Sequence, residues 1–228
     1  IQTLFDFEKS RADVASLCQR VEHRYANVMC GIMDQFASGL GRSNHALLLD
    51  CRTLSHVNIP TNLEKYRIVI ISSEVKRELT SSAYNERRGQ CEEGVALLRQ
   101  FDPSIASLRD VTPDLFDAYG DQLSGIVLQR CRHVITENAR VLDASAALAA
   151  DELAQFGRLM TASHNSLRDD FEVSCDELDC LVDIAYGTEG VLGSRMTGAG
   201  FGGCTVTLIH MDAIETLRAN LLPYTDRF

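Results

Sequence analysis

One aspartate stands at the start of a short helical pattern, where its carboxylate could act on a reacting hydroxyl. Asp34 lies in the run Cys30-Gly31-Ile32-Met33-Asp34-Gln35, and the following residues predict a helix over 33–38 that ends at Gly39. A carboxylate in the first turn of a helix commonly serves as a cap or as a partner of the helix dipole. The other interpretation is a carboxylate held beside a hydroxyl that it orients or deprotonates. The local sequence by itself favours the first.

A glycine-rich run near the end of the chain is the second candidate. Residues 193–203 are expected to form a loop, and a strand is expected to follow at 204–209. Within the run, 198–203 has the spacing G-x-G-x-x-G, which in dinucleotide-binding folds lies between a strand and a following helix. Because a strand follows here, the spacing argues against a dinucleotide site. The alternatives left open are a backbone that approaches a phosphate closely and a tight turn in a packed sheet.

The elements that position these residues are mostly helices. Apolar periodicity predicts helices over residues 10–27, 33–38, 82–100, 122–149, 151–167 and 213–222. Thr112 followed by Pro113 is typical of a helix start, and residues 174–177 fit a capping box before a further helix. Strands are expected at 45–50 and 204–209, and a buried strand at the β-branched run 66–71. The resulting fold class is helix-rich α+β.

Composition excludes several classes of protein. The 228 residues are 45% hydrophobic, which suits one large globular domain or two small ones. The formal net charge is −10, whereas a nucleic-acid-binding protein normally presents a basic face. The basic clusters at 86–88 and 129–133 are interpreted as solvated helix faces. No stretch approaches the ~20 apolar residues of a membrane span, so neither nucleic acid nor membrane is expected as a partner.

The eight cysteines do not form a metal-binding pattern. None lies in a C-x-x-C pair, and none is spaced from a histidine as in a zinc site. Several, such as Cys131 and Cys204, lie within apolar patterns. We therefore expect buried, reduced thiols in a cytoplasmic protein.

Four separated motifs resemble those of galactokinases, which belong to the GHMP family of small-molecule kinases. The first extends from Glu22 through the run around Asp34 to Asp50-Cys51-Arg52. The second is Ser81-Ser82-Ala83-Tyr84 with Arg87-Arg88, and the third extends from Ser163-His164 to Val173. The fourth is the glycine-rich run from Gly193 to Cys204. The motifs occur in the family's order over roughly residues 10–210, which makes chance agreement very improbable.

The resemblance implies a role for each candidate residue. Asp34 corresponds to the family's catalytic aspartate at the galactose C1 hydroxyl, and Gly31 and Tyr84 correspond to residues that bind the sugar. Glu22 corresponds to the acidic ligand of the Mg²⁺ that accompanies ATP. The loop glycines near the phosphate-binding region would be Gly198, Gly200, Gly202 and Gly203. ATP and Mg²⁺ are thus the implied cofactors.

The resemblance also implies how the chain is organised. Residues 1–62 would be the end of the amino-terminal, ribosomal S5-like domain, and residues 63–228 the carboxyl-terminal GHMP domain, a ferredoxin-like α/β sandwich. Two family motifs do not occur in the sequence, the amino-terminal sugar loop and the Ser-rich loop around the ATP phosphates. We therefore expect a carboxyl-terminal portion of a monomeric kinase that is inactive by itself.

The implied reaction transfers the ATP γ-phosphate to the C1 hydroxyl of α-D-galactose, the first committed step of galactose catabolism. Phosphoryl transfer passes through a loose transition state, so Asp34 would orient the hydroxyl and accept its proton late. Three alternatives remain, namely a galactose- and ATP-binding sensor, an N-acetylgalactosamine kinase and a generic nucleotide-binding module. The residues around Asp34 and at 50–52 favour galactose, and the absence of a helix after the glycine loop argues against the generic module.

Overall fold

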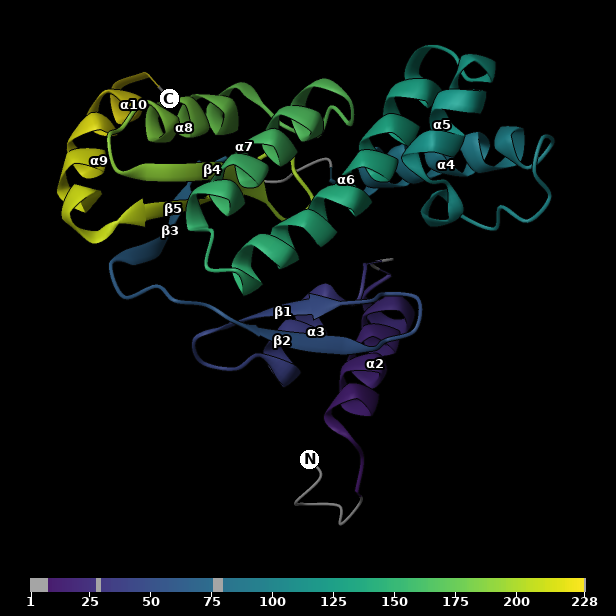
Figure 1. Ribbon diagram of the computed structural model, residues 1–228, viewed down its shortest axis with the longest axis horizontal. Helices are drawn as coiled ribbons and strands as arrows, with labels where there is room; N and C mark the ends of the chain where they lie inside the picture. The colour runs from purple at the N-terminus through teal and green to yellow at the C-terminus, as the bar shows by residue number, and fades with distance from the viewer. Residues whose placement is uncertain (1–7, 28–29, 76–79, 228) are drawn as a thin grey trace. The chain divides into compact units, whose positions relative to one another are not determined.

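The computed structural model describes residues 8–27, 30–75 and 80–227, without the side chains of 80–82, 84 and 225–227 (Figure 1). The chain divides into two compact units, Ile1–Leu63 and Glu64–Phe228. Both units combine helices with antiparallel strands, which confirms the prediction of an α+β fold. In the described residues, no helix is long and apolar enough to cross a membrane.

The first unit packs two helices against a two-stranded hairpin. Its elements are α2 (Arg11–Val21), the π-helical turn η1 (Glu22–Ala26), α3 (Met33–Leu40), β1 (His45–Leu49) and β2 (His56–Pro60). A capping box starts α2, because the Ser10 hydroxyl accepts from the Asp13 N–H and the Asp13 carboxylate accepts from the Ser10 N–H. The core of the unit is centred on Phe36, which is fully buried with Ile32 and Ala15 around it. The start of α3 is therefore fixed by apolar packing.

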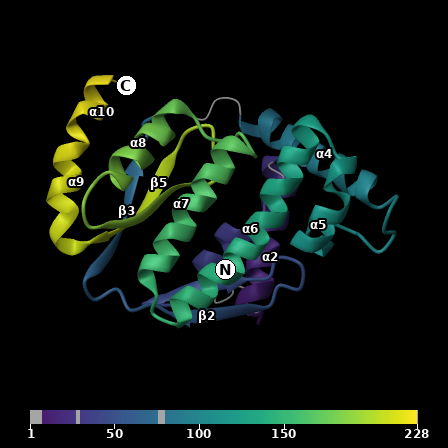
Figure 2. The same ribbon diagram turned by 45° about the horizontal axis from the view of Figure 1, so that its top comes forward.

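The second unit contains a three-stranded antiparallel sheet. Its strands are β3 (Tyr66–Ser72), β4 (Val191–Thr197) and β5 (Cys204–His210), in the order β3-β5-β4. Helices α7 (Leu153–Asp169) and α8 (Asp176–Tyr186) pack against this sheet, as Figure 2 shows. Gly157 of α7 meets Gly193 of β4 so closely that a Cβ on either would overlap backbone atoms of the other element. Helix α7 can approach the sheet this closely only because both positions lack a side chain.

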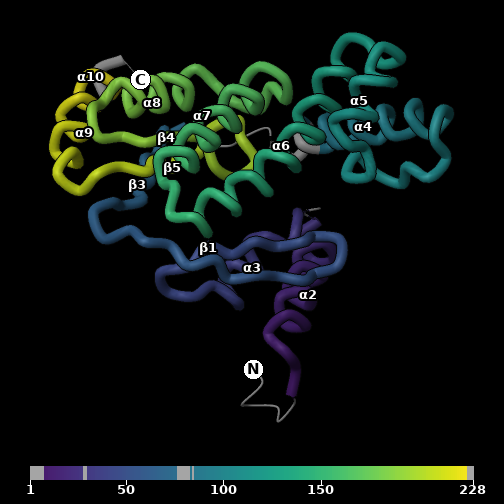
Figure 3. The backbone as a smooth tube through the Cα atoms, viewed as in Figure 1, coloured from purple at the N-terminus to yellow at the C-terminus, as the bar shows by residue number. Residues whose placement is uncertain are grey.

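The other helices of the second unit fall into two groups. They are α4 (Thr80–Leu98), α5 (Pro113–Tyr119), α6 (Gly125–Ala149), α9 (Ile214–Asn220) and α10 (Leu222–Arg227), with short 3₁₀ turns η2 (Leu108–Asp110), η3 (Gly120–Gln122) and η4 (Met211–Ala213). Helices α4, α5 and α6 share an apolar cluster, and α9 and α10 lie at the carboxyl-terminal end. Figure 3 shows α4 and α5 grouped around α6, at the far end of this unit from α9. Leu98, Ile105 and Cys131 are almost completely buried there. Thr112 caps α5 ahead of Pro113, as predicted.

Several sequence-based expectations were wrong. Strand β3 is not buried, since Ile68 and Ile70 are 56% and 68% exposed. The predicted capping box at 174–177 does not form, because Cys175 is the N-cap and makes no side-chain cap bond. Residues 193–197 belong to strand β4, so the glycine loop is confined to 198–203.

Each of the two basic clusters, predicted to be a solvated helix face, contains at least one side chain that is withdrawn from solvent. The Arg130 side chain is 1% exposed, and His133 is 6% exposed. The Arg87 side chain is 13% exposed, whereas its neighbours Glu86 and Arg88 are 62% and 57% exposed. A local pattern of charge cannot reveal this burial, because the partners come from other elements.

Candidate functional site

A cavity of about 470 Å³ in the first unit brings two predicted site residues together. Glu22, at the start of the π-helical turn, and Asp34, in the first turn of α3, both line it. The other lining residues are Arg11, Val14, Ala15, Cys18, Gln35, Ser38 and Gly39. Two carboxylates that are separated in sequence thus face one space.

Asp34 is held in place by the residues on either side of it. Ile32 is the N-cap of α3 and makes no side-chain cap bond, but Ile32 and Phe36 are buried in the core. Asp34 lies between them on the exposed side of the same turn. The first-turn N–H groups of a helix lack intrahelical partners and favour a negative charge nearby. This arrangement presents an anchored carboxylate to the cavity.

The Glu22 carboxylate is oriented by two donors. The Gln35 amide nitrogen donates to Oε1 at 2.6 Å, and the Cys30 thiol donates to Oε2 at 3.2 Å. The hydrogen bond from Gln35, followed by that from Cys30, lowers the pKa of Glu22 below its ordinary value. Conversely, burial, followed by the bond to Glu22, raises the pKa of the Cys30 thiol. The pair therefore consists of an ionised carboxylate and a protonated thiol at neutral pH.

The sequence did not single out Cys30 and Gln35 for this task. The loop that carries Cys30 is itself fixed, because Gln19 and His23 donate to the Cys30 carbonyl at 3.1 and 2.9 Å. Gln35 follows Asp34 directly, so one short segment carries the cavity aspartate and orients Glu22. The side-chain oxygen of Gln35, Oε1, is buried and has no hydrogen-bond partner among the described residues. The run around Asp34 contained both residues, but only tertiary contact connects them to Glu22.

The donor set of the cavity is compatible with a magnesium ion that is held mainly by other ligands. Among the described residues, no three His, Cys, Asp or Glu side chains are arranged as a metal site. Mg²⁺ in nucleotide sites keeps several waters and phosphate oxygens and uses only one or two carboxylates. A single oriented, ionised Glu22 carboxylate suits that requirement.

The glycine loop is a hairpin connection between β4 and β5, whose last and first residues, Thr197 and Cys204, are paired. Residues 198, 200, 202 and 203 have φ values of 84°, 88°, 114° and 95°, which glycine adopts without strain. A Cβ on Gly200 would lie 2.1 Å from the Val173 carbonyl oxygen. A strand thus precedes and follows the loop, which agrees with the argument against a dinucleotide site.

The other predicted site residues are Gly31, Tyr84 and the loop glycines, and Gly31 is not among the residues that line this cavity. Gly31 precedes the N-cap of α3, and a Cβ there would meet no atom within 4 Å, so packing does not require glycine. Tyr84 lies near the start of α4, and its side chain is outside the part of the chain that the structure describes. Tyr84 and the glycine loop belong to the second unit, whereas Gly31, Glu22 and Asp34 belong to the first.

Two family models match the chain. The model described as GHMP kinases N terminal domain matches residues 1–42, and the model described as GHMP kinases C terminal matches residues 144–223. The cavity aspartate lies within the first match, and the glycine loop lies within the second.

Curated relatives agree with these matches. The chain is 46% identical over 209 residues to a galactokinase of Roseiflexus sp. (strain RS-1), covering 92% of this chain and 53% of that protein. It is 45% identical over 216 residues to a galactokinase of Exiguobacterium sibiricum, covering 95% of this chain and 55% of that protein. The chain therefore spans about half the length of the curated relatives that it matches.

Solved structures support the fold. The structure of Lactococcus lactis galactokinase complexed with galactose superposes with a TM-score of 0.93 at 39% identity, covering 99% of this chain and 58% of that one. Methanococcus jannaschii mevalonate kinase superposes with a TM-score of 0.60 at 19% identity over 97% of this chain and 56% of that one. The second likeness concerns the fold alone.

Proposed function

The chain belongs to the GHMP kinase family, and from this we propose that it is part of a galactokinase. The proposed enzyme transfers the γ-phosphate of ATP to the C1 hydroxyl of α-D-galactose, giving galactose 1-phosphate and ADP. The observation that carries this proposal is the cavity in which Asp34 and Glu22 meet. The relatedness to galactokinases over more than nine-tenths of the chain supports the choice of sugar.

Asp34 is proposed to act on the nucleophile. Its carboxylate would accept a hydrogen bond from the C1 hydroxyl and hold it in line with the phosphorus atom. Because little bonding to the nucleophile is needed early in a loose transition state, the proton would pass to Asp34 late. The main contributions of the site would be orientation and stabilisation of charge. Asp34 is well suited to this, because the buried Ile32 and Phe36 fix the turn that carries it.

Glu22 is proposed as a ligand of the magnesium ion that accompanies ATP. When bound, this ion would neutralise charge on the phosphates. The Gln35 amide and the Cys30 thiol would keep the Glu22 carboxylate ionised and fixed in direction, as outer partners of metal ligands commonly do. Gln35 would in this way couple the ligand to the segment that carries Asp34.

Roles are also proposed for the other site residues. The open space beside Gly31 supports a role in leaving room for the sugar, and Tyr84 is proposed to bond a sugar hydroxyl. The loop glycines 198, 200, 202 and 203 are proposed to support the phosphate side. Residues 1–62 would be the end of the amino-terminal domain and 63–228 the carboxyl-terminal GHMP domain of a monomeric, cytoplasmic enzyme.

The proposal is tested by the acceptor specificity of the full-length protein. ADP formation is measured with galactose, with N-acetylgalactosamine and without sugar, and the phosphorylated product is identified by ³¹P NMR. We expect rapid, galactose-dependent formation of a C1 phosphate. Faster turnover with N-acetylgalactosamine than with galactose would show that the enzyme is an N-acetylgalactosamine kinase. Binding of galactose and ATP without turnover would indicate a sensor instead.

A further inference from the structure

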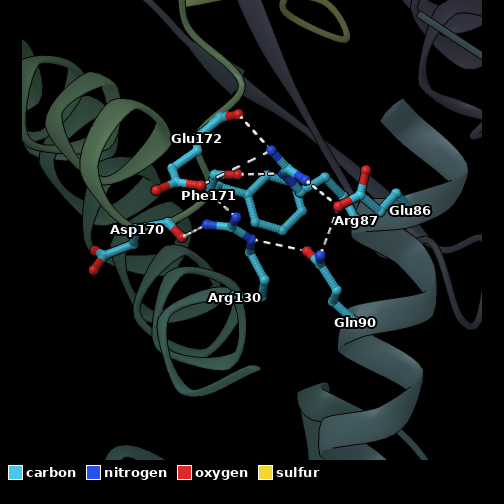
Figure 4. Close-up of polar contacts among 7 residues, drawn as sticks. All are labelled: Glu86, Arg87, Gln90, Arg130, Asp170, Phe171 and Glu172. Carbon is cyan, nitrogen blue, oxygen red and sulfur yellow. Dashed lines mark hydrogen bonds and ion pairs between the residues drawn. The ribbon is translucent and has the colours of Figure 1, made fainter. Parts of the chain in front are cut away.

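Two arginines, one buried and one partly buried, hold a segment that contacts the glycine loop. Figure 4 shows the guanidinium groups of Arg87, from α4, and Arg130, from α6, both directed at residues 170–172. Arg130 donates to the Asp170 carbonyl at 2.6 Å, to Glu172 Oε2 at 2.5 Å and to the Gln90 side-chain oxygen at 3.0 Å. Since its side chain is 1% exposed, these three bonds replace the hydration that the charge has lost.

Arg87 completes the arrangement by binding the next two carbonyls. Its Nε donates to the Phe171 carbonyl at 2.8 Å, and its Nη2 donates to the Glu172 carbonyl at 3.0 Å. Three consecutive carbonyls, of residues 170, 171 and 172, are thus occupied by two guanidinium groups. Glu172 has a φ of 51°, a conformation that a non-glycine residue holds only when its surroundings enforce it.

Residues 170–173 are in direct contact with the glycine loop. The Phe201 N–H donates to the Val173 carbonyl at 2.7 Å, and Gly200 packs against the same oxygen. The Phe201 ring lies 6.0 Å from the Arg87 guanidinium carbon and shares an apolar cluster with Phe171 and Val173. Any shift of 170–173 would therefore be transmitted to residues 200 and 201.

We propose that Arg87 and Arg130 are positioning residues for the glycine loop, acting through the backbone of residues 170–173. In the proposed enzyme the loop supports the phosphate side of the site, so the arginines would set the affinity for ATP; this part rests on the proposed function. The guanidinium fork accounts for the choice of arginine, because Arg87 holds two neighbouring carbonyls through two nitrogens. A lysine ammonium is a point charge on a flexible stem and does not reproduce this geometry.

The test uses the full-length protein with Arg87→Met and Arg87→Lys, and with Arg88→Met as the matched control. Arg88 is the next residue on α4, but its side chain is 57% exposed and pairs with Glu92 on the same helix. Hydrogen exchange is followed in peptides covering residues 198–205, and KM is measured for ATP and for galactose. All measurements are made below the onset of unfolding of each variant.

We expect both Arg87 variants to exchange the Phe201 amide faster and to raise the KM for ATP by about 10-fold, within the range known for small displacements of positioning contacts. The KM for galactose should stay within about 2-fold, because that ligand does not depend on the loop. Arg88→Met should change neither. A second variant is Glu172→Gln, which should fold because the Glu172 side chain is 50% exposed. It should also speed exchange of the Phe201 amide, but to a smaller extent.

Unchanged exchange at residues 198–205 in both the Arg87 variants and Glu172→Gln would overturn the proposal. So would faster exchange with unchanged affinity for ATP, because the arginines would then serve stability alone. If the unmodified protein binds ATP but phosphorylates no galactose, the proposed function fails. The exchange and ATP-binding measurements would still test whether Arg87 and Arg130 position the glycine loop.

Discussion

Replacement of Gly200 by alanine should damage the glycine loop in a measurable way. The residue has a φ of 88°, and a Cβ there would lie 2.1 Å from the Val173 oxygen and 2.9 Å from the Val173 Cβ. Ordinary van der Waals contact begins at 3.4 Å, so either the loop or residue 173 must move by more than about 1 Å. A side chain in the left-handed region costs about 1–2 kcal/mol, and overpacking adds about 1–3 kcal/mol. The lower entropy of the unfolded alanine chain offsets about 1 kcal/mol of this, which leaves a net loss of roughly 1–4 kcal/mol.

The assay compares the free energy of unfolding of Gly200→Ala with that of Gly89→Ala in the full-length protein. Gly89 lies in α4, and a Cβ there would meet no atom within 4 Å. Alanine should therefore stabilise that helix by about 0.4–1 kcal/mol. The two substitutions are chemically identical and are expected to have opposite signs. A Gly200→Ala protein as stable as the unmodified one would refute the packing described for the loop.

Three further predictions follow from buried and cavity groups. Burial lowers the pKa of His133 from its ordinary 6.5 to about 4, so the unfolded chain binds more protons between these values. The free energy of unfolding should fall by about 3 kcal/mol as pH decreases from 6.5 to 4, and His133→Gln should flatten this slope in thermal melts. Burial also raises the pKa of Cys91 to about 11 and that of Cys131 to about 12. Iodoacetamide should therefore alkylate the exposed Cys18 and Cys51 much faster than Cys91 and Cys131, as followed by mass spectrometry. Gln35→Leu should raise the Mg²⁺ concentration needed for half-maximal rate by about 10-fold while leaving the KM for galactose nearly unchanged, and an unaltered Mg²⁺ dependence would remove Gln35 from the proposed site.

Local sequence patterns predicted the elements that are determined locally. The apolar spacing along 122–149 predicted α6 to within three residues, and Thr112-Pro113 marked the start of α5. Strand β2 was not predicted, because in the run His56–Pro60 only Ile59 is buried and the alternation is weak. The β-branched run 66–71 indicated a strand but could not reveal that one side of it is exposed. That depends on helices more than a hundred residues away, since Ala185 of α8 and Leu217 of α9 lie in the apolar cluster that includes Val69 and Ile71.

The same division holds for the candidate site. The motif around Asp34 predicted a carboxylate at the reacting hydroxyl. Only the folded structure shows that Asp34 and Glu22 line the same cavity. The bonds from Cys30 and Gln35 to Glu22 depend on the π-helical turn, which leaves no recognisable signal in the sequence. Arg130 was misjudged because its acceptors, at residues 170 and 172, lie about forty positions away.

The most direct test of the central claim is the turnover number of Asp34→Asn in the full-length protein, measured as formation of galactose 1-phosphate. The substitution keeps the size of the side chain and the helix start but removes the proton acceptor. We expect kcat to fall by about 10²–10⁴-fold, while the KM for galactose changes by less than about 3-fold. A kcat close to that of the unmodified protein would contradict the assignment of Asp34 to the reacting hydroxyl.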